Sequence, residues 1–367
     1  MQGSRVDVNA LVAGWLRDLA FVQTAREKRL AFKRAADSVW QLDRPLTDLV
    51  DGGALTARIP GVGPSSTRVI LEVLEAGDSA TVDRVIAASG RGAEVVRRRQ
   101  LRRNFLSRAE VLRVLADRRL DGPTAADYRG DFQMHSAWSD GRTSIAAMAT
   151  ACRERGYDRC AITDHSHGLR IAGGISMDDA ARQHREIDAL NVQLAPAFRI
   201  LKGIEANIDA DGALDIPLDG APAFELVLAA PHAGLRLAQP QTARLLTALS
   251  HPAVRILAHP SGRKIDARAG IAADWAVVFA RAAELGVAVE IDGDPSRQDV
   301  DFERAAMALE AGCLFALDSD AHAPGQLHYA DTALAHARLA GIPPARIVNC
   351  WPDARFDRWL DQRSSGR

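Results

Sequence analysis

Apolar residues follow two different periods along this chain, and the change falls near Tyr128. In about the first hundred residues they recur at spacings of three and four, over residues 8–30 and 30–39, with Leu, Ala, Arg and Lys dominating. This spacing predicts helices. After Tyr128, short β-rich runs alternate with helical stretches. Regular alternation of this kind is typical of parallel strands with helices outside them, so it predicts an α/β barrel or a doubly wound sheet.

The later part of the chain repeats one design, in which an apolar run ends on His, Asp or Glu. The run that starts at Asp131 leads directly into a loop with His135 and Asp140. The design recurs in residues 159–165, 198–205, 226–232, 254–259 and 313–322, and one more strand is expected at 287–292. Predicted helices between these runs span residues 143–155, 177–192, 239–249, 271–285, 300–311 and 329–340. In a barrel the carboxyl ends of all strands open on one face, where catalytic groups collect.

Length and composition favour one large domain beside a smaller one. A chain of 367 residues with 47% hydrophobic content can bury a large core. Gly122 and Pro123 end the last helical stretch before the pattern changes. We therefore expect a helical domain at residues 1–90, a basic helical linker at 91–127 and a barrel at 128–367.

The charge distribution is more informative than the net charge, which is only −1. Between Arg91 and Leu120 there are ten Arg residues against Glu94, Glu110 and Asp117. The rest of the chain is correspondingly acidic, so a basic segment stands beside an acidic body.

The four cysteines indicate a reducing compartment. They form no C-x-x-C pair, and Cys160 and Cys313 lie inside apolar runs, which favours reduced thiols in a core. No apolar run approaches the length of a membrane span, and the first residues lack the apolar stretch of a signal peptide. We expect a cytoplasmic protein that does not bind membranes.

A glycine turn in the helical region resembles a helix-hairpin-helix. In Ile59-Pro-Gly-Val-Gly63 the turn leads into a helix with Gly63 at the N-cap and Pro64 at the first helical position. Amides exposed at such a helix N-terminus are suited to binding a nucleic-acid phosphate. The order of residues 31–39, this turn and residues 70–77 is similar to the N-terminal domain of bacterial family X DNA polymerases. Between residues 80 and 128, however, there is no room for a polymerase palm.

Two groups of residues are therefore candidates for binding DNA. The turn contributes Gly61, Gly63 and Ser65, and the basic segment contributes Arg97, Arg98 and Arg102. Arginines along a nucleic-acid backbone give affinity that depends on salt but not on sequence. The alternatives are that the glycines only join two packed helices and that the arginines are a solvated helix face.

The motifs at the strand ends resemble those of the PHP (polymerase and histidinol phosphatase) family, most closely the C-terminal PHP domain of bacterial family X polymerases. The resemblance runs from about Asp131 to about Asn349, and its motifs occur in order. They are Gln133-Met-His135, Ser139-Asp-Gly141, Thr163-Asp-His165, Gly203-Ile-Glu205, His232, Ala258-His-Pro260 and Ser319-Asp-Ala-His322.

The resemblance implies a distorted seven-stranded barrel that binds two or three divalent metal ions. The first ion would lie among Gln133, His135, Glu205 and Asp320, the second among Glu205, His232 and His259, and the third among Asp140, His165 and His322. Glu205, Asp320 and His135 would be central to catalysis. Imidazole and carboxylate ligands suit zinc, manganese or iron. Gln133 departs from the usual His-x-His of the family, and a neutral amide oxygen is a weaker ligand.

Three basic residues in loops after strand ends are candidates for binding a substrate phosphate. These are Arg170, Arg263 and Lys264. An Arg can contact phosphate through two hydrogen bonds, whereas a Lys acts as a point charge. The alternative is that these residues pair with surface acids or with Asp164.

Together these features predict a metal-dependent phosphoesterase that hydrolyses phosphodiester or phosphomonoester bonds. DNA ends in repair are the expected substrate, through a 3'-5' exonuclease or a 3'-phosphatase activity. One alternative is a small-molecule phosphatase of the histidinol-phosphate or nucleotide type. A second alternative is a non-catalytic adaptor that binds DNA and whose barrel holds structural metal.

Overall fold

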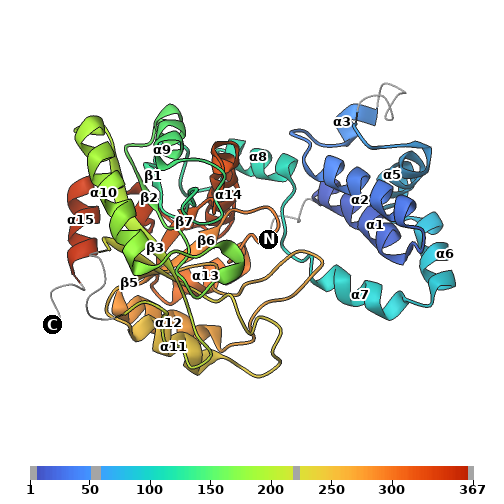
Figure 1. The fold of residues 1–367 in the computed structure, drawn as a ribbon. Helices are drawn as coiled ribbons and strands as arrows, with labels where there is room; N and C mark the ends of the chain where they lie inside the picture. The colour runs from blue at the N-terminus through green and yellow to red at the C-terminus, as the bar shows by residue number, and fades with distance from the viewer. Residues whose placement is uncertain (1–5, 51–58, 218–223, 363–367) are drawn as a thin grey trace. The chain divides into compact units, whose positions relative to one another are not determined.

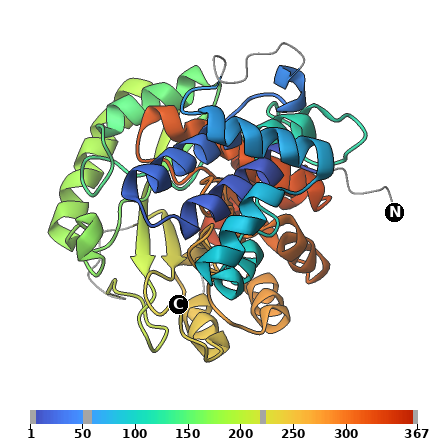
Figure 2. The ribbon, with the colours of Figure 1, turned by 90° about the vertical axis from the view of Figure 1, so that its right-hand side faces the viewer.

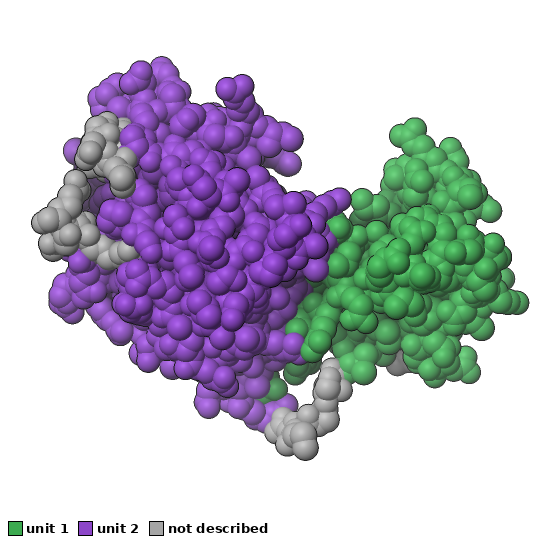
Figure 3. Space-filling model, turned by 90° about the horizontal axis from the view of Figure 1, so that it is seen from below, with its two compact units in different colours: residues 1–117, 265–267 green, residues 118–264, 268–367 purple. Residues whose placement is uncertain are grey.

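A computed structural model of the protein describes residues 6–50, 59–217 and 224–362. The chain divides into two compact units (Figure 3). Unit 1 comprises residues 1–117 with the short segment 265–267, and unit 2 comprises residues 118–264 and 268–367. The division at residue 117 assigns most of the expected linker, residues 91–127, to unit 1.

Unit 1 is all helical, as the apolar spacing predicts. Its helices are α1 (Val8–Val22), α2 (Arg26–Trp40), α3 (Thr47–Val50), α5 (Pro64–Ala76), α6 (Ala80–Ser89), α7 (Gly92–Gln100) and α8 (Arg108–Ala116) (Figure 1). The expectation of continuous helical periodicity over residues 8–30 is wrong in one respect, because α1 ends at Val22 and Gln23 is extended, with ψ of 135°. This break lets α2 pack back on α1, and both bury their apolar stripes in one core around Val12, Leu16 and Val39.

The glycine turn has the expected local geometry. Gly61 has a φ of +79°, which favours glycine because a side chain there would be strained. Val62 N donates to Ile59 O at 3.2 Å and closes the turn. Helix α5 then begins after Gly63, with Pro64 in its first turn.

Unit 2 is a ring of seven parallel strands that follow one another in chain order. They are β1 (Gly130–Asp131), β2 (Arg159–Ile162), β3 (Arg199–Asn207), β4 (Leu226–Ala230), β5 (Val254–Leu257), β6 (Ala288–Asp292) and β7 (Leu314–Asp318). Just past β1 and β7, Met134 and Ala321 form a parallel bridge that nearly closes the ring. The prediction of an α/β fold is confirmed, and of its two forms the barrel is correct.

The helices of unit 2 lie outside the strands (Figures 1 and 2). They are α9 (Ile145–Glu154), α10 (Met177–Leu194), α11 (Thr242–Ser250), α12 (Trp275–Leu285), α13 (Phe302–Glu310), α14 (Ala330–Leu339) and α15 (Asp353–Asp361). Some begin later than expected because a polar residue caps them. Helix α9 starts after Ser144, which accepts from Ala147 N, and α12 starts after Asp274, which accepts from Val277 N.

Helix α15 covers the amino ends of the strands. Arg159 and Arg199 are the first residues of β2 and β3, and they bind Asp353 and Asp357 of α15. Phe356 stacks on Phe132 with ring centroids 4.8 Å apart, within a core that continues through Leu201 and Leu228 inside the barrel. The open end of the barrel is therefore the end where the strands finish.

Cys152, Cys160 and Cys313 are buried free thiols, and Cys350 is a half-buried one. In the described parts of the chain, no helix combines the length and the apolar character that crossing a membrane requires.

Asn349 joins the two strands on either side of the seam in the ring. It is fully buried, and its amide nitrogen donates to Gly130 O at 2.9 Å and to Leu317 O at 2.8 Å. Its amide oxygen accepts from Leu317 N at 2.8 Å. One side chain thus satisfies backbone groups of both β1 and β7 where these strands do not pair directly.

We predict that Asn349→Ala lowers the free energy of unfolding by about 3 kcal/mol, because it leaves several buried backbone groups without partners. Urea denaturation of the full chain, followed by circular dichroism, measures the change. Gln193→Ala, at an exposed position of α10, is the control and should leave the midpoint within experimental error. A loss below about 1 kcal/mol for Asn349→Ala would contradict the role of this residue in the seam.

Candidate metal centre

The residues predicted to bind metal all lie at the open end of the barrel. Predicted ligands follow shortly after the ends of β1, β2, β4, β5 and β7. Strand β3 contains one near its end. In chain order these ligands are Gln133, His135, Asp140, His165, Glu205, His232, His259, Asp320 and His322. Residues more than a hundred positions apart in the sequence therefore meet at one rim.

Glu205 is the centre of this arrangement. Its carboxylate oxygens lie 2.8 Å from His165 Nδ1, 2.8 Å from His259 Nε2, 3.2 Å from His232 Nε2 and 3.6 Å from His135 Nε2. The Glu205 side chain is fully buried. Four imidazoles that follow four different strands thus surround one carboxylate.

A second group of donors adjoins the first. His322 Nε2 lies 3.3 Å from Asp140 Oδ1, and His165 Nε2 lies 3.6 Å from the same oxygen. The His135 ring stacks between those of His165 and His322, with centroids 4.3 Å from each. Asp320 connects to this group, because its Oδ1 is 3.0 Å from His135 Nε2.

Two sets of these donors are compact enough to hold an ion. In each set the ligand atoms lie within 4.8 Å of one another, and His165 belongs to both. The first set is His135, Asp140, His165 and His322, and the second is His165, Glu205 and His232. This grouping differs in detail from the division into three sites that the sequence suggested, in which His165 belonged to one site only.

Several buried polar atoms at this rim lack hydrogen-bond partners within the described residues. They are both amide atoms of Gln133 and the Nδ1 atoms of His135 and His259. Burying so many unsatisfied polar atoms is costly, and divalent cations satisfy imidazole nitrogens and carboxylate oxygens in such a cluster. The residues present therefore fit a cluster of divalent metal ions. The unpaired amide of Gln133 is compatible with Gln133 being one of the metal ligands.

The electrostatics of the rim keep its carboxylates charged. Burial acts to raise the pKa of Glu205, but His165 and His232 outweigh it and hold this pKa well below its usual range. Burial likewise opposes the charged form of His322, yet its contacts with Asp140 and Asp320 raise its pKa to about 9. Ionised carboxylates are the form that binds metal.

Two further side chains orient the predicted ligands, although no motif marks them as ligand supports. Asp164 accepts from Ser136 N at 2.8 Å and from Gln183 Nε2 at 2.6 Å, which fixes the loop that carries Asp140. Asn207 Oδ1 lies 3.2 Å from His232 Nδ1, so that His232 Nε2 faces Glu205. Asn207 is two residues after Glu205 in β3 and so shares its face, which is the one signal that could have found it.

The loop after β1 also requires a glycine. A side chain at Gly141 would bring its Cβ within 2.4 Å of His135 O. The Ser139-Asp-Gly141 motif therefore places Asp140 near His322 only because residue 141 is glycine.

The three residues predicted to bind phosphate have different surroundings. Arg263 is buried and forms an ion pair with Asp301, so its guanidinium is already engaged. Arg170 is exposed in the short 3-10 helix Arg170–Ala172, and Lys264 is exposed as well.

The predicted DNA-binding residues also divide into two kinds. Gly61, Ser65 and Arg97 are exposed. Arg102, in contrast, has only 10% of its side chain exposed and donates to Asp18 Oδ1 at 2.6 Å. The Arg98 guanidinium lies 4.4 Å from the centroid of the Phe21 ring. Much of the basic segment thus packs within unit 1.

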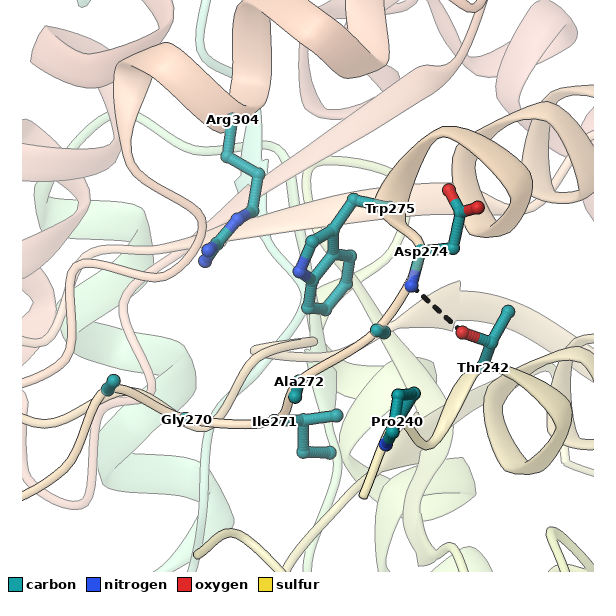
Figure 4. Close-up of a pocket in the computed structure, with 10 residues that line it drawn as sticks. Pro240, Thr242, Gly270, Ile271, Ala272, Asp274, Trp275 and Arg304 are labelled. Atoms are coloured by element: carbon teal, nitrogen blue, oxygen red, sulfur yellow. Dashed lines mark hydrogen bonds between the residues drawn. The ribbon is translucent and has the colours of Figure 1, made fainter. Parts of the chain in front are cut away.

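A separate pocket of about 470 Å³ is lined by the loop before α12 and by residues at the starts of α11, α12 and α13 (Figure 4). The Arg304 guanidinium lies 4.9 Å from the ring centroid of Trp275, and Asp274 N donates to Thr242 Oγ1 at 2.8 Å. No predicted metal ligand is among the residues that line it. The metal chemistry therefore belongs to the strand ends and not to this pocket.

Both the helical region and the barrel region of the chain are similar to known proteins. A family model described as a helix-hairpin-helix domain matches residues 7–79. The DNA polymerase/3'-5' exonuclease PolX of Bacillus subtilis is 38% identical over 224 residues, which cover 60% of this chain and 39% of that protein. The chain thus spans about two fifths of that relative.

Two other proteins are similar to the chain over most of their own length. A probable phosphatase of Shewanella sediminis is 30% identical over 226 residues, which cover 58% of this chain and 85% of that protein. A solved histidinol phosphate phosphatase of Lactococcus lactis, in complex with zinc, L-histidinol and phosphate, covers 57% of this chain and 94% of its own, with a TM-score of 0.44 and 18% identity. On the motifs, the barrel and the sequence relatives, this chain belongs to the PHP (polymerase and histidinol phosphatase) family and carries a helix-hairpin-helix domain before its barrel.

Proposed function

We propose that this protein is a metal-dependent phosphoesterase that acts at DNA ends. The observation that carries the proposal is the position of Glu205, whose buried carboxylate lies within 3.6 Å of four imidazole nitrogens. A structural metal site would need fewer donors, since such sites are usually closed by four ligands. The proposal includes two or three divalent ions, which would be zinc, manganese or iron.

Divalent ions in such a site polarise a phosphate ester and lower the pKa of water, which is the chemistry that hydrolysis requires. The residues of the chain hold the donors in place. Asn207 fixes the ring of His232, Asp164 fixes the loop of Asp140, and His165 belongs to both sets of donors. Since His259 and Asp320 have positive φ values of 25° and 52°, the backbone is strained at two more of the predicted ligands. Strain of this kind often marks functional residues.

The choice of a phosphate ester rests on the relatives. One is named a polymerase and 3'-5' exonuclease, and another a probable phosphatase. Both names describe the hydrolysis of phosphate esters, a phosphodiester in the first case. The PHP barrel is the part of the present chain whose chemistry corresponds to these activities.

The choice of DNA rests on unit 1. The helix-hairpin-helix match covers residues 7–79, and the turn at Gly61 leads into the N-terminus of α5. Backbone amides in the first turn of a helix have no partner within the helix, so they are available to a phosphate oxygen. Unit 1 would hold the DNA backbone, and unit 2 would cleave a terminal phosphodiester or remove a 3'-phosphate.

A second candidate is a small-molecule phosphatase. The observation that favours it is the Shewanella sediminis relative, of which the chain covers 85% and which is named only a probable phosphatase. A panel of labelled oligonucleotides and small phosphate monoesters separates the two candidates. Turnover of small monoesters without measurable DNA affinity at low salt would favour this second candidate.

We predict that Glu205→Gln lowers the metal-dependent hydrolysis of a labelled oligonucleotide by at least about a hundredfold, because a neutral amide cannot replace a buried carboxylate that contacts four imidazoles. The assay is run with added Mn²⁺ or Zn²⁺, and a chelator should abolish the activity of the unchanged protein.

The matched control is Glu284→Gln, which makes the same chemical change at an exposed position of α12. It should keep full activity. Hydrolysis by Glu205→Gln within about threefold of the unchanged protein would contradict the central role of Glu205.

We also predict that Ser65→Glu weakens DNA binding about five- to tenfold, because it places a negative charge where the α5 amides face a phosphate. An acidic residue in the first turn of a helix is favourable for the helix itself, so the fold should be retained. Fluorescence anisotropy with a labelled duplex at low salt measures the affinity.

Ala87→Glu is the control for this change, since it adds the same charge at an exposed position of α6. Equal affinities of the two variants would show that net charge alone is responsible. In that case the helix-hairpin-helix turn would not be the DNA contact.

A further inference from the structure

The loop after β6 carries an arginine that neither the sequence motifs nor the comparisons single out. We propose that Arg297 binds the phosphate group of the substrate at the open end of the barrel. This inference rests on the proposed phosphoesterase function and names a residue that positions its substrate.

Arg297 reaches the predicted metal ligands directly. Its Nη1 lies 3.4 Å from Asp320 Oδ2 and 3.9 Å from Asp292 Oδ2. Asp320 in turn lies 3.0 Å from His135 through its other oxygen. Among the described residues, Arg297 is the one Arg or Lys that lies within 4.0 Å of any of the carboxylates of Asp140, Glu205 and Asp320, and its contact is with Asp320.

The guanidinium still has donors to offer. An arginine has five N–H groups. Within the described chain, the Arg297 side chain contacts Asp320 and Asp292 and makes no hydrogen bond. About a quarter of the side chain, 24%, is exposed, so a ligand can approach it. Planar guanidinium groups of this kind bind phosphate oxygens through paired hydrogen bonds.

The turn that presents Arg297 is rigid. Arg297 N donates to Asp294 O at 2.9 Å, and Asp292 and Asp299 exchange two backbone hydrogen bonds of 2.6 and 3.1 Å around the turn. The next residue, Gln298, is fixed by His336, whose Nε2 lies 2.8 Å from Gln298 Oε1. A guanidinium held on such a turn loses little conformational freedom when it binds a ligand.

Backbone strain connects this turn to the metal centre. Gln298 has a φ of +47°, a conformation that side chains other than Gly rarely adopt. The same feature occurs at His259 and Asp320, which are predicted metal ligands. Strained residues persist where the surrounding structure and function require them, and here they lie on three neighbouring loops of one rim.

The other candidate cations are less well placed. Arg263 is engaged with Asp301 in a buried ion pair, while Arg170 and Lys264 are exposed in their loops. Arg297 alone among these four combines contact with a predicted ligand and a partly exposed side chain. A phosphate bound next to Asp320 would therefore lie within reach of Arg297.

The test measures binding of inorganic phosphate, the product shared by phosphomonoester substrates, to the full chain loaded with Mn²⁺. Isothermal titration calorimetry gives the affinity, and elemental analysis gives the metal content of the same samples. We expect Arg297→Ala to weaken phosphate binding about ten- to a hundredfold at unchanged metal content. Arg297→Lys keeps the charge but loses the planar pair of donors. Its phosphate affinity should therefore lie between that of the unchanged protein and that of Arg297→Ala.

The matched control is Arg281→Ala on α12, where the arginine pairs with Glu284 at the surface. It should bind phosphate as the unchanged protein does. Phosphate affinity of Arg297→Ala within about twofold of the unchanged protein overturns the inference. Loss of metal from both Arg297 variants also overturns it, because the residue would then serve the ligands and not the substrate.

Failure of the proposed function gives a different result. If the unchanged, metal-loaded protein neither binds phosphate nor hydrolyses any ester, then the phosphoesterase proposal fails and the Arg297 inference fails with it. If the unchanged protein does both and Arg297→Ala does the same, only the Arg297 inference is wrong.

Discussion

A single buried carboxylate surrounded by imidazoles is the contact on which the open end of this barrel depends. Burial on its own would favour a protonated Glu205, but His165 and His232 keep it ionised. These partners come from different strands, so their positions depend on the register of the whole ring. A shift of one residue in any strand would turn its side chains to the opposite face. The site is therefore a property of the complete barrel, and features far from it, such as the Asn349 seam, contribute to its geometry.

Much of the fold and of the candidate site could be predicted from the sequence. The strand-helix alternation indicated parallel strands, and runs such as Leu226–Ala230, which are buried on both faces, read as continuously apolar. Because parallel strands bring their carboxyl ends to one side, residues as distant as His135 and His322 could be expected to meet. Helix boundaries were less predictable, since the break after Val22 and the start at Trp275 depend on packing and on a capping side chain.

What the sequence could not provide were contacts between residues that no motif links. Asp164 supports a loop that lies 28 residues before it, and Arg297 meets Asp320 across two loops. An arginine-rich segment likewise does not reveal which of its members are solvated. Arg97 is exposed, whereas Arg102 packs against Asp18, and both look alike in a run of basic residues. Only the three-dimensional arrangement separates a charged surface from an internal ion pair.

The packing of α15 has a consequence for turnover. Phe356 and Trp359 fill the end of the barrel where the strands begin, in one core with Phe132 and Leu228. Because these described side chains occupy that end, the substrate and the released phosphate of the proposed reaction would both use the opening at the strand ends. Bound product would then compete with the next substrate for that opening.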